Sequence, residues 1–493
     1  MYNKNMNIIP RPKSYKLLGE EDNFNLEGLL FIDRLFETEK SCLVEHFNVQ
    51  TTTDLEKANI KFLYNKDIKG DESYTLNIYK ETITLCANNS AGLFYGIQSL
   101  KQLCCINDGR VEAPGIIITD SPRFTWRGAM VDTSRHFMSV KSLKKFLDLL
   151  AIHKINKFHW HLTDDQGWRI EIKKYPELTK IGSKRVLNTV KEYYSSDFYS
   201  QEDIKSIVKY AMERHIEVIP EIDIPGHSTA AIASIKELSC INEELNVATT
   251  WGVHNKILCA GKESVFTWLD DVIKEIAELF PGRYIHLGGD EALKDYWESC
   301  PLCQKRMEDE GLENTKELQS YFIKRVSKTI NKYGKKVLGW EEVIEGGLAD
   351  DITVFSWQGV EVGVEAANKG HDVIMCPNQS ACYFDHKHLD DEDEPGWLGV
   401  CSVKDTWSFN PIAEGITEEA KKHILGVQGN TWTELIMYPK TLEYMVFPRL
   451  TALSETMWYG VEDRDWEEFK NRLKSFKLTL DNMGVNYYRG DLE

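Results

Sequence analysis

Segments with strand-like and helix-like patterns alternate along most of this chain, and no other feature limits its fold as strongly. The helical segments repeat apolar residues at the i, i+3, i+4 spacing of one buried face, as Ile204, Ile207 and Val208 do. The predicted strands between them are 127–132, 157–162, 216–222, 284–287, 336–339, 353–357, 372–376 and 424–428. Because such alternation gives a parallel sheet, eight units predict a closed (β/α)8 TIM barrel.

The pattern differs before and after this region. Residues 74–79 and 82–85 alternate polar and apolar positions across a short turn, as hairpin strands do, and residues 90–103 have the pattern of a helix. We therefore expect an α/β protein of three parts. These are a small α/β domain of sheet plus helix (1–122), the barrel (123–460) and a C-terminal helical extension that packs on the barrel (461–493).

One stretch of the predicted barrel is irregular. Between the seventh and eighth strands, a long segment contains no clearly defined helix. The pattern therefore predicts the seventh strand without predicting the helix that should follow it.

Composition narrows the classes of function. With 42% hydrophobic and 28% charged residues, the 493-residue chain is typical of soluble globular proteins. A net charge of −18 argues against nucleic acid as a partner. The first thirty residues lack a signal-peptide core, and no apolar run is long enough to span a membrane. We expect a cytoplasmic protein without a membrane partner, unless an export segment was removed, and the number of subunits stays open, a homodimer included.

The cysteines fit a reducing compartment. Their number, 11, is odd, so at least one thiol is free. Cys300-Pro301-Leu302-Cys303 has the spacing of half a zinc site, but no second pair of ligands follows before Cys376. We therefore expect a packed turn here, and neither a metal nor a cofactor.

Two adjacent carboxylates mark the candidate site. In residues 283–291, RYIHLGGDE, an apolar run ends at two glycines followed by Asp290 and Glu291. Neighbouring side chains of an extended segment point in different directions, so the two can contact different atoms of one ligand. Polar and aromatic residues also follow the other predicted strands, where (β/α)8 barrels carry their active sites. The candidates are Arg135, Asp164, His227, Asp290, Glu291, Trp340, Trp357, Tyr383, Asp385, Trp432 and Glu434.

This set of side chains predicts a carbohydrate ligand. Indole and phenol rings stack on the C–H faces of sugars, while carboxylates and guanidinium groups bind sugar hydroxyls. A single tryptophan would more often belong to the core. The prediction therefore depends on their recurrence after several strands.

The motifs resemble those of the family 20 glycoside hydrolases, the β-N-acetylhexosaminidases. The resemblance covers roughly residues 124–460 through RGAMVDTSRHF, HWHLTDDQGWR, EIDIPGH, HLGGDE, VLGWEE, VFSWQG and GNTWTE. The opening IIPRPKSY is similar to the small N-terminal domain of that family. The resemblance implies an exo-acting enzyme that removes terminal N-acetylglucosamine or N-acetylgalactosamine from oligosaccharides or glycoconjugates.

The resemblance also implies a mechanism in which the 2-acetamido oxygen of the substrate attacks the anomeric carbon and forms an oxazolinium intermediate. Glu291 would protonate the glycosidic oxygen and later deprotonate water. Asp290 would remain ionised, accept the acetamido N–H and stabilise the developing positive charge. Tyr383 would bind the acetamido oxygen.

Further roles follow from the same resemblance. Three indoles would enclose the acetamido methyl group and the sugar ring, namely those of Trp340, Trp357 and Trp432. Three charged side chains would bind hydroxyls, with Arg135 and Glu434 on the ring and Asp385 near the 6-hydroxyl. Asp164 and His227 would shape the site and position Glu291, while His136, His159 and His161 would be structural.

Two other classes of function remain open. A metal-dependent barrel hydrolase would use His159, His161, His227 and Asp290 as ligands. A non-catalytic glycan-binding protein would keep the aromatic residues and lack turnover, although the presence of both Asp290 and Glu291 argues against it.

Overall fold

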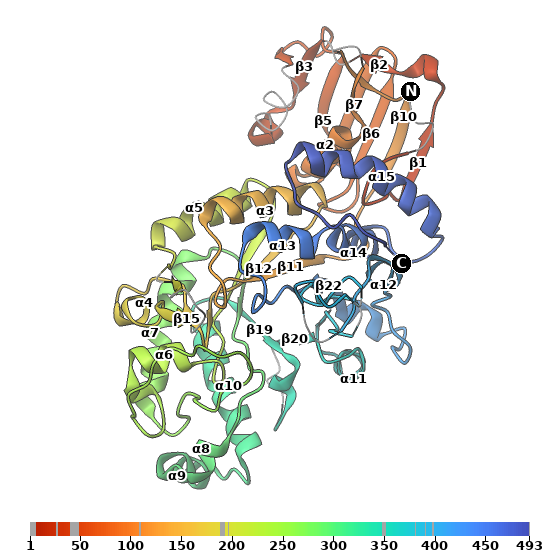
Figure 1. Ribbon diagram of the computed structural model, residues 1–493. Coiled ribbons are helices and arrows are strands. Elements are labelled where there is room, and N and C mark those ends of the chain that lie inside the picture. Colours follow the sequence, from red (N-terminus) through yellow and green to blue (C-terminus); the bar gives the residue numbers. More distant parts are fainter. Residues whose placement is uncertain are drawn as a thin grey trace.

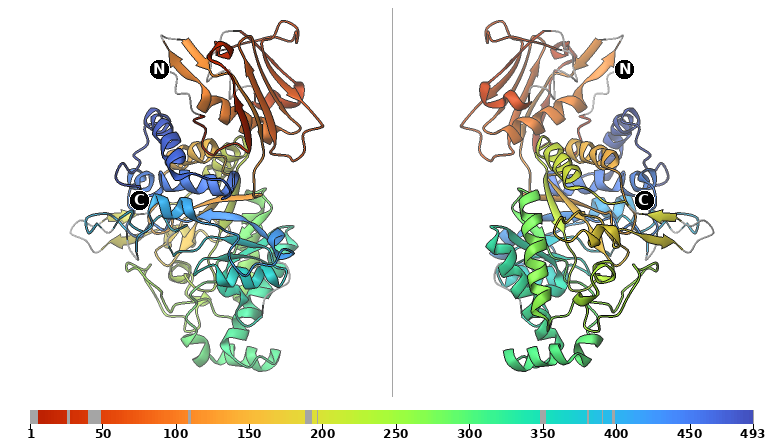
Figure 2. Two further views of the ribbon diagram at one scale, coloured as in Figure 1. Left: turned by 90° about the vertical axis from the view of Figure 1, so that its right-hand side faces the viewer. Right: turned by 90° about the vertical axis from the view of Figure 1, so that its left-hand side faces the viewer.

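The computed structural model describes residues 6–25, 28–39, 49–107, 110–187, 193–195, 197–347, 352–379, 381–389, 391–396 and 399–492. These residues form an N-terminal sheet domain, a closed barrel and a C-terminal helix (Figure 1). In both side views, the N-terminal sheet lies at one end of the molecule and the barrel forms the rest (Figure 2).

Eight parallel strands close the barrel, as the sequence predicts. In barrel order they are β11 (Trp126–Asp132), β12 (Lys157–His161), β17 (Glu217–Glu221), β18 (Tyr284–His286), β19 (Lys336–Trp340), β20 (Ile352–Ser356), β21 (Val373–Met375) and β22 (Ile424–Gly429). Nearly all their residues are buried, because the barrel interior lies on one face and the helices cover the other. The expected TIM-barrel fold is confirmed.

Helices follow the strands with one clear exception. They are α3 (Val140–Ile152), α5 (Gln201–Met212), α7 (Glu263–Leu279), α10 (Thr315–Lys332), α11 (Glu361–Asn368), α12 (Val403–Ser408), α13 (Pro439–Val446) and α14 (Arg449–Trp458). After β19 the described chain has only the short 3-10 helix η4 (Glu341–Ile344). The irregular stretch noted in the sequence contains α12 and the 3-10 helix η5 (Ala420–His423).

Short elements lie in the loops that leave the carboxyl ends of the strands. After β12 come β13 (Thr163–Asp164), β14 (Gly167–Trp168), α4 (Glu177–Lys180), β15 (Arg185–Leu187) and β16 (Tyr193–Ser195). After β17 come α6 (Thr229–Ser234) and η3 (Lys236–Leu238), and after β18 come α8 (Asp295–Ser299) and α9 (Pro301–Glu310). These loops therefore cover the end of the barrel that carries the candidate residues.

The N-terminal domain is built on a seven-stranded sheet of order β1-β10-β6-β7-β5-β3-β4. Its strands are β1 (Ser14–Leu17), β3 (Leu29–Ile32), β4 (Gln50–Thr51), β5 (Ile60–Tyr64), β6 (Tyr74–Tyr79), β7 (Thr82–Ala87) and β10 (Ile116–Asp120). The expected hairpin is β6 and β7, and the expected helix is α2 (Ser90–Leu103), which packs on them. A second sheet consists of β2 (Phe24–Asn25), β8 (Cys105–Asn107) and β9 (Arg110–Ala113), and two 3-10 helices are η1 (Glu20–Asp22) and η2 (Arg34–Glu39).

Helix α15 (Trp466–Asn482) joins the C-terminal segment to both other parts. Arg472 of this helix pairs with both carboxylate oxygens of Glu455 in α14, at 2.8 and 2.9 Å. The same guanidinium donates to the carbonyl oxygen of Ile8 at 3.0 Å. The helix therefore packs against the barrel and also holds the N-terminal segment in place. In the part of the chain that the structure describes, no helix combines the length and apolarity needed to cross a membrane.

Candidate active site

A row of ion pairs crosses the carboxyl end of the barrel. Arg135, in the loop after β11, binds Asp164 Oδ2 through Nη1 at 2.8 Å. Asp164 Oδ1 lies 3.1 Å from Nδ1 of His227, which follows β17. Burial alone would raise the pKa of Asp164, but Arg135 and His227 outweigh it and lower that pKa below its usual range. Two loops far apart in sequence are thus held together by a charged aspartate.

His227 extends this row to the carboxylate pair. Its Nε2 lies 3.6 Å from Asp290 Oδ2 and 3.4 Å from Glu291 Oε2. Burial opposes a charge on the ring, yet Asp164 and the hydrogen-bonded carboxylates raise the pKa of His227 well above its ordinary value. The structure therefore places a cationic imidazole between Asp164 and the Asp290–Glu291 pair.

Backbone geometry directs the two carboxylates into environments of different solvent exposure. Gly288 and Gly289 have φ angles of +73° and +100°, and Glu291 itself has a φ angle of +46°. These left-handed conformations turn the chain sharply after β18, and they favour glycine. As a result the Asp290 side chain is 10% exposed, whereas that of Glu291 is 37% exposed. One carboxylate faces the interior and its neighbour faces solvent.

Asp290 lies beside a second buried carboxyl group, that of Asp223. Burial raises the pKa of Asp290 to about 7, helped by the nearby Glu342 and opposed by His227. Burial and the charge of Asp290 raise the pKa of Asp223 well above its usual value. Asp223 is therefore the protonated member of the pair, and Asp290 titrates near neutral pH. The expectation that Asp290 is ionised stays a prediction, since burial and the nearby Glu342 oppose its negative charge while His227 favours it.

Glu291 lines a cavity of about 330 Å³ at the surface of the barrel. Lys294, Glu342 and Gln358 line the same cavity. Glu342 accepts hydrogen bonds from the indole Nε1 of Trp357 at 3.0 Å and from Nε2 of Gln358 at 2.9 Å. The exposed carboxylate thus borders a pocket that is large enough for part of a ligand.

Aromatic side chains meet at the same end of the barrel. The rings of Trp340 and Trp432 have centroids 5.8 Å apart, and those of Trp357 and Tyr383 are stacked at 6.3 Å. Trp432 also lies against the guanidinium group of Arg135, at 5.0 Å from the ring centroid. The four predicted aromatic residues therefore form two contacting pairs, one of which is joined to the row of ion pairs.

Two further carboxyl groups complete the predicted set. Asp385 Oδ1 and Glu434 Oε2 are buried and have no hydrogen-bond partner among the described residues. Burial, with the charge of Glu434, raises the pKa of Asp385 to about 8. Asp290 Oδ1 is a third buried oxygen of this kind. Because buried polar atoms normally find partners, unpartnered acceptors on three of the predicted site residues indicate a site for a ligand with several donors.

Sequence reasoning left Glu221 and His161 out of the site, yet both support it. Glu221 lies inside the barrel, where its Oε2 contacts Nδ1 of His161 and its Oε1 accepts a hydrogen bond from the Trp340 indole at 2.8 Å. Nε2 of His161 then binds Asp164 at 2.8 Å. These contacts hold the indole of Trp340 and the carboxylate of Asp164 in place from the barrel interior. Both residues lie at the carboxyl ends of their strands, His161 in β12 and Glu221 in β17. This position in the sequence could have identified them as site residues.

The ligand set of the metal-dependent alternative is divided between two places. His159 and His161 both contact Glu221, whereas His227 and Asp290 lie beside each other. Among the described residues, these four side chains do not converge as one group of metal ligands. The geometry therefore gives no support to that particular metal site.

Comparisons with known proteins identify the family. Residues 124–461 match the model of the glycosyl hydrolase family 20 catalytic domain, and residues 5–121 match that of glycosyl hydrolase family 20, domain 2. The chain belongs to glycosyl hydrolase family 20. The two matched segments correspond to the predicted barrel and to the predicted small N-terminal domain.

Individual relatives agree with this assignment. A β-hexosaminidase of Porphyromonas gingivalis is 40% identical over 99% of this chain and 65% of its own length, so this chain spans just under two thirds of that relative. The exo β-N-acetylglucosaminidase of Vibrio harveyi, solved in complex with N-acetylglucosamine, superposes with a TM-score of 0.90. It is 33% identical, with 98% of this chain and 78% of that chain covered.

A third relative is the N-acetyl-β-hexosaminidase of Streptomyces plicatus, solved in complex with Thio-NAglucal. It is 32% identical and has a TM-score of 0.88 over 99% of this chain and 97% of that chain. The fold of family 20 thus extends over nearly the whole chain, including the N-terminal domain. The roles of the individual site residues stay predictions.

Proposed function

We propose that this chain is an exo-acting β-N-acetylhexosaminidase that cleaves terminal N-acetylhexosamine from glycans by substrate-assisted, retaining hydrolysis. One observation carries the proposal: Asp290 and Glu291 are adjacent in sequence, yet one is buried against His227 and the other is exposed beside a cavity. Such a pair suits two different tasks, since a buried carboxylate can orient an amide and an exposed one can exchange a proton with the leaving group.

In the first step, the acetamido oxygen of the substrate forms a bond to the anomeric carbon as the glycosidic C–O bond breaks. Glu291 transfers its proton to the departing oxygen. Asp290 accepts the acetamido N–H and stabilises the positive charge of the oxazolinium ion. Because the nucleophile belongs to the bound sugar, holding it close to the reacting carbon removes much of the entropic barrier.

In the second step, a water molecule attacks the anomeric carbon from the side that the leaving group vacated. Glu291 now takes a proton from that water, and the bond between the acetamido oxygen and the anomeric carbon breaks. Two inversions at one carbon retain its configuration. We place the leaving group, and then the water, over the cavity that Glu291 borders.

The remaining residues would hold the terminal sugar. The unpartnered buried oxygens of Asp385 and Glu434 can accept hydrogen bonds from hydroxyls, and Arg135 can donate them. Trp340, Trp357 and Trp432 can surround the acetamido methyl group and the ring. This arrangement supports recognition of a chain end, because these groups would enclose the hydroxyls of a single terminal sugar.

Hydrolysis of nitrophenyl and methyl glycosides by Glu291→Gln tests the proposal. We expect a loss of roughly 10²- to 10⁴-fold for the methyl N-acetylglucosaminide, whose poor leaving group needs a proton, and a much smaller loss for the nitrophenyl glycoside. The control is Glu298→Gln, which changes an exposed glutamate in the neighbouring helix α8 and should leave both rates unchanged.

A second comparison tests substrate assistance. The wild-type chain should cleave nitrophenyl N-acetylglucosaminide or N-acetylgalactosaminide at least ~10³-fold faster than the 2-hydroxy sugars, and a thiazoline analogue should inhibit it. Similar rates for acetamido and 2-hydroxy substrates would rule out the internal nucleophile. Binding of N-acetylglucosamine without any turnover would instead favour a glycan-binding protein.

A further inference from the structure

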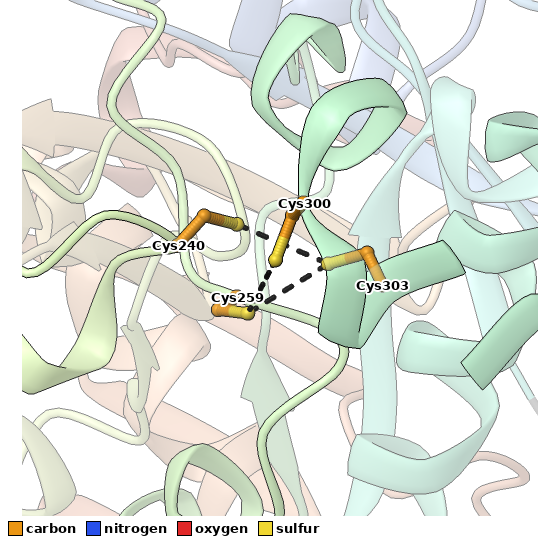
Figure 3. A group of neighbouring side chains, drawn as sticks. All are labelled: Cys240, Cys259, Cys300 and Cys303. Carbon is orange, nitrogen blue, oxygen red and sulfur yellow. Dashed lines mark hydrogen bonds between the residues drawn. The ribbon is translucent and has the colours of Figure 1, made fainter. Parts of the chain in front are cut away.

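Four cysteines converge beside the loop that carries the carboxylate pair (Figure 3). Cys240 and Cys259 belong to the long segment between β17 and α7, whereas Cys300 and Cys303 lie at the start of α9. Their sulfur atoms point toward one another and all lie within 4.8 Å of each other. Cys259, Cys300 and Cys303 are buried, and Cys240 is half-buried.

The distances between these sulfurs match a metal site. Cys259 Sγ lies 3.7 Å from Cys303 Sγ and 3.9 Å from Cys300 Sγ, and Cys240 Sγ lies 3.9 Å from Cys303 Sγ. Four sulfurs placed tetrahedrally at the usual Zn–S distance of about 2.3 Å would be about 3.8 Å apart. Three of the six sulfur–sulfur distances therefore match a zinc tetrathiolate, and the other three are within 4.8 Å.

A pair of disulfides fits the same atoms less well. A disulfide needs its sulfurs at about 2.0 Å, far closer than any of these contacts. Moreover, Cys259 has two sulfur neighbours at nearly equal distance, Cys300 and Cys303, and Cys303 also has two, Cys240 and Cys259. Each central sulfur is thus shared between two partners, which is the arrangement of ligands around one ion.

The surrounding backbone supports an anionic cluster. The backbone N–H of Gly261 lies close to the sulfur of Cys259. A Cβ atom at Gly261 would lie 2.3 Å from the backbone carbon of Leu302, so only glycine lets these two segments approach so closely. Nζ of Lys262 donates to the carbonyl oxygen of Ser239, which places a positive charge next to Cys240. Both features would offset the negative charge of four thiolates around a divalent ion.

We propose that Cys240, Cys259, Cys300 and Cys303 bind one structural zinc ion. Four protein ligands close the coordination sphere, so the ion has no open position for a substrate and acts as a cross-link. No second pair of cysteines follows Cys303 at the spacing of a zinc site. The second pair precedes it, by 63 residues for Cys240 and by 44 for Cys259.

The position of this site suggests what the cross-link holds. The segment that contains Cys240 and Cys259 follows His227, and Cys300 lies nine residues after Glu291. The zinc would therefore tie together the two loops that supply the imidazole and the carboxylates. The inference does not depend on the proposed hydrolase activity, because metal content can be measured without any substrate.

The first test is metal analysis of the full chain, purified without a polyhistidine tag and without chelators. Inductively coupled plasma mass spectrometry should find about one zinc per chain, and intact mass should show these four thiols unoxidised once the metal is removed. A chain with less than ~0.1 zinc per molecule, with iron in its place, or with disulfides among these cysteines would overturn the proposal.

The second test uses variants of single cysteines. Cys303→Ser should lose the zinc and lower the Tm by roughly 5 °C or more, since the cross-link is removed. The control is Cys86→Ser in β7, which changes a half-buried thiol of the N-terminal domain and should keep one zinc per chain. If Cys303→Ser does not fold, titration of the wild-type chain with a mercurial reagent decides: zinc should be released as four thiols react, and release after one or none contradicts the site.

Discussion

Asp290, Asp385 and Glu434 each carry an oxygen that the fold buries without a hydrogen-bond partner among the described residues. Burying such a group costs roughly 1–3 kcal/mol unless a partner is supplied. Proteins keep this cost where a ligand provides the partner, so the three oxygens mark the place where donors of a substrate would bind. At the scale of single residues, the site is thus defined by incomplete hydrogen bonding as much as by the residue types.

The substitution Asp385→Asn tests the cost of burying this carboxyl group, through the pH dependence of stability. The pKa of Asp385 is raised to about 8 in the fold, whereas an unfolded aspartate titrates near 4. Between these values the folded chain keeps a proton that the unfolded chain releases, so the free energy of unfolding falls as the pH rises. The asparagine stays neutral throughout. From pH 5 to pH 8 the wild-type Tm should fall by about 4 °C more than that of the variant, from a difference of ~4 kcal/mol.

The control for this measurement is Asp393→Asn, which changes an exposed aspartate on the following loop. It should keep the wild-type slope of Tm against pH. If Asp385→Asn has that same slope, then Asp385 is ionised in the folded state and the desolvation argument fails.

At this scale the sequence predicted the residue types of the site but not their states. The motifs led to the prediction that His227 positions Glu291, and in the structure His227 Nε2 lies 3.4 Å from Glu291 Oε2. The pKa of Asp290 could not be predicted in this way. It depends on burial, on His227 and on Glu342, which surround Asp290 only after β17 and β19 take their places in the barrel.

The turn between β18 and α8 is the element on which the carboxylate pair depends. It follows a strand of only three described residues, Tyr284–His286, and passes through two glycines in left-handed conformation. A Cβ atom at Gly288 would lie 1.8 Å from Oδ1 of Asp223, so the turn is packed directly on the buried carboxyl group. The glycines therefore provide space as well as backbone conformation.

Gly288→Ala should destabilise the chain through both effects. The left-handed conformation costs an alanine about 1–2 kcal/mol, and displacing Asp223 adds about 1–3 kcal/mol. The control is Gly311→Ala, at the end of α9, where φ is +67° and no atom lies within 4 Å of the added Cβ. Thermal unfolding should show a loss at Gly288 at least twice that at Gly311. Equal losses would mean that Asp223 moves aside without cost.

Strands were easier to predict than the segments between them. Most barrel strands contain a short apolar run, as expected of strands buried on both faces, and all eight lie within two residues of their predicted bounds. Helix α12 lies in an irregular stretch and has only six residues, too few to show a helical period. The cysteine cluster was missed for a related reason, since Cys240 and Cys259 belong to loops whose approach to α9 leaves no local pattern.

At the scale of the whole molecule, a buried polar contact joins the N-terminal domain to the barrel. Lys154, just before β12, is fully buried, and its Nζ lies 3.0 Å from Asp120 Oδ2 in β10 and 3.0 Å from the hydroxyl of Tyr74 in β6. The indole Nε1 of Trp458 donates to the other oxygen of Asp120 at 2.9 Å. Asp120 precedes β11 and Lys154 precedes β12, so this contact lies at the amino ends of the barrel strands, opposite the end that carries the candidate active site.

Lys154→Met should separate the stabilities of the two domains without changing the site. Removing one partner of a buried pair leaves Asp120 as an uncompensated charge, which costs about 3–5 kcal/mol. Calorimetry should show the N-terminal domain unfolding below the barrel, while kcat/KM at 25 °C stays that of the wild type. The control is Lys332→Met, which breaks an exposed pair with Asp270 and should cost less than ~1 kcal/mol. A single unshifted transition in Lys154→Met would show that this pair does not couple the two domains.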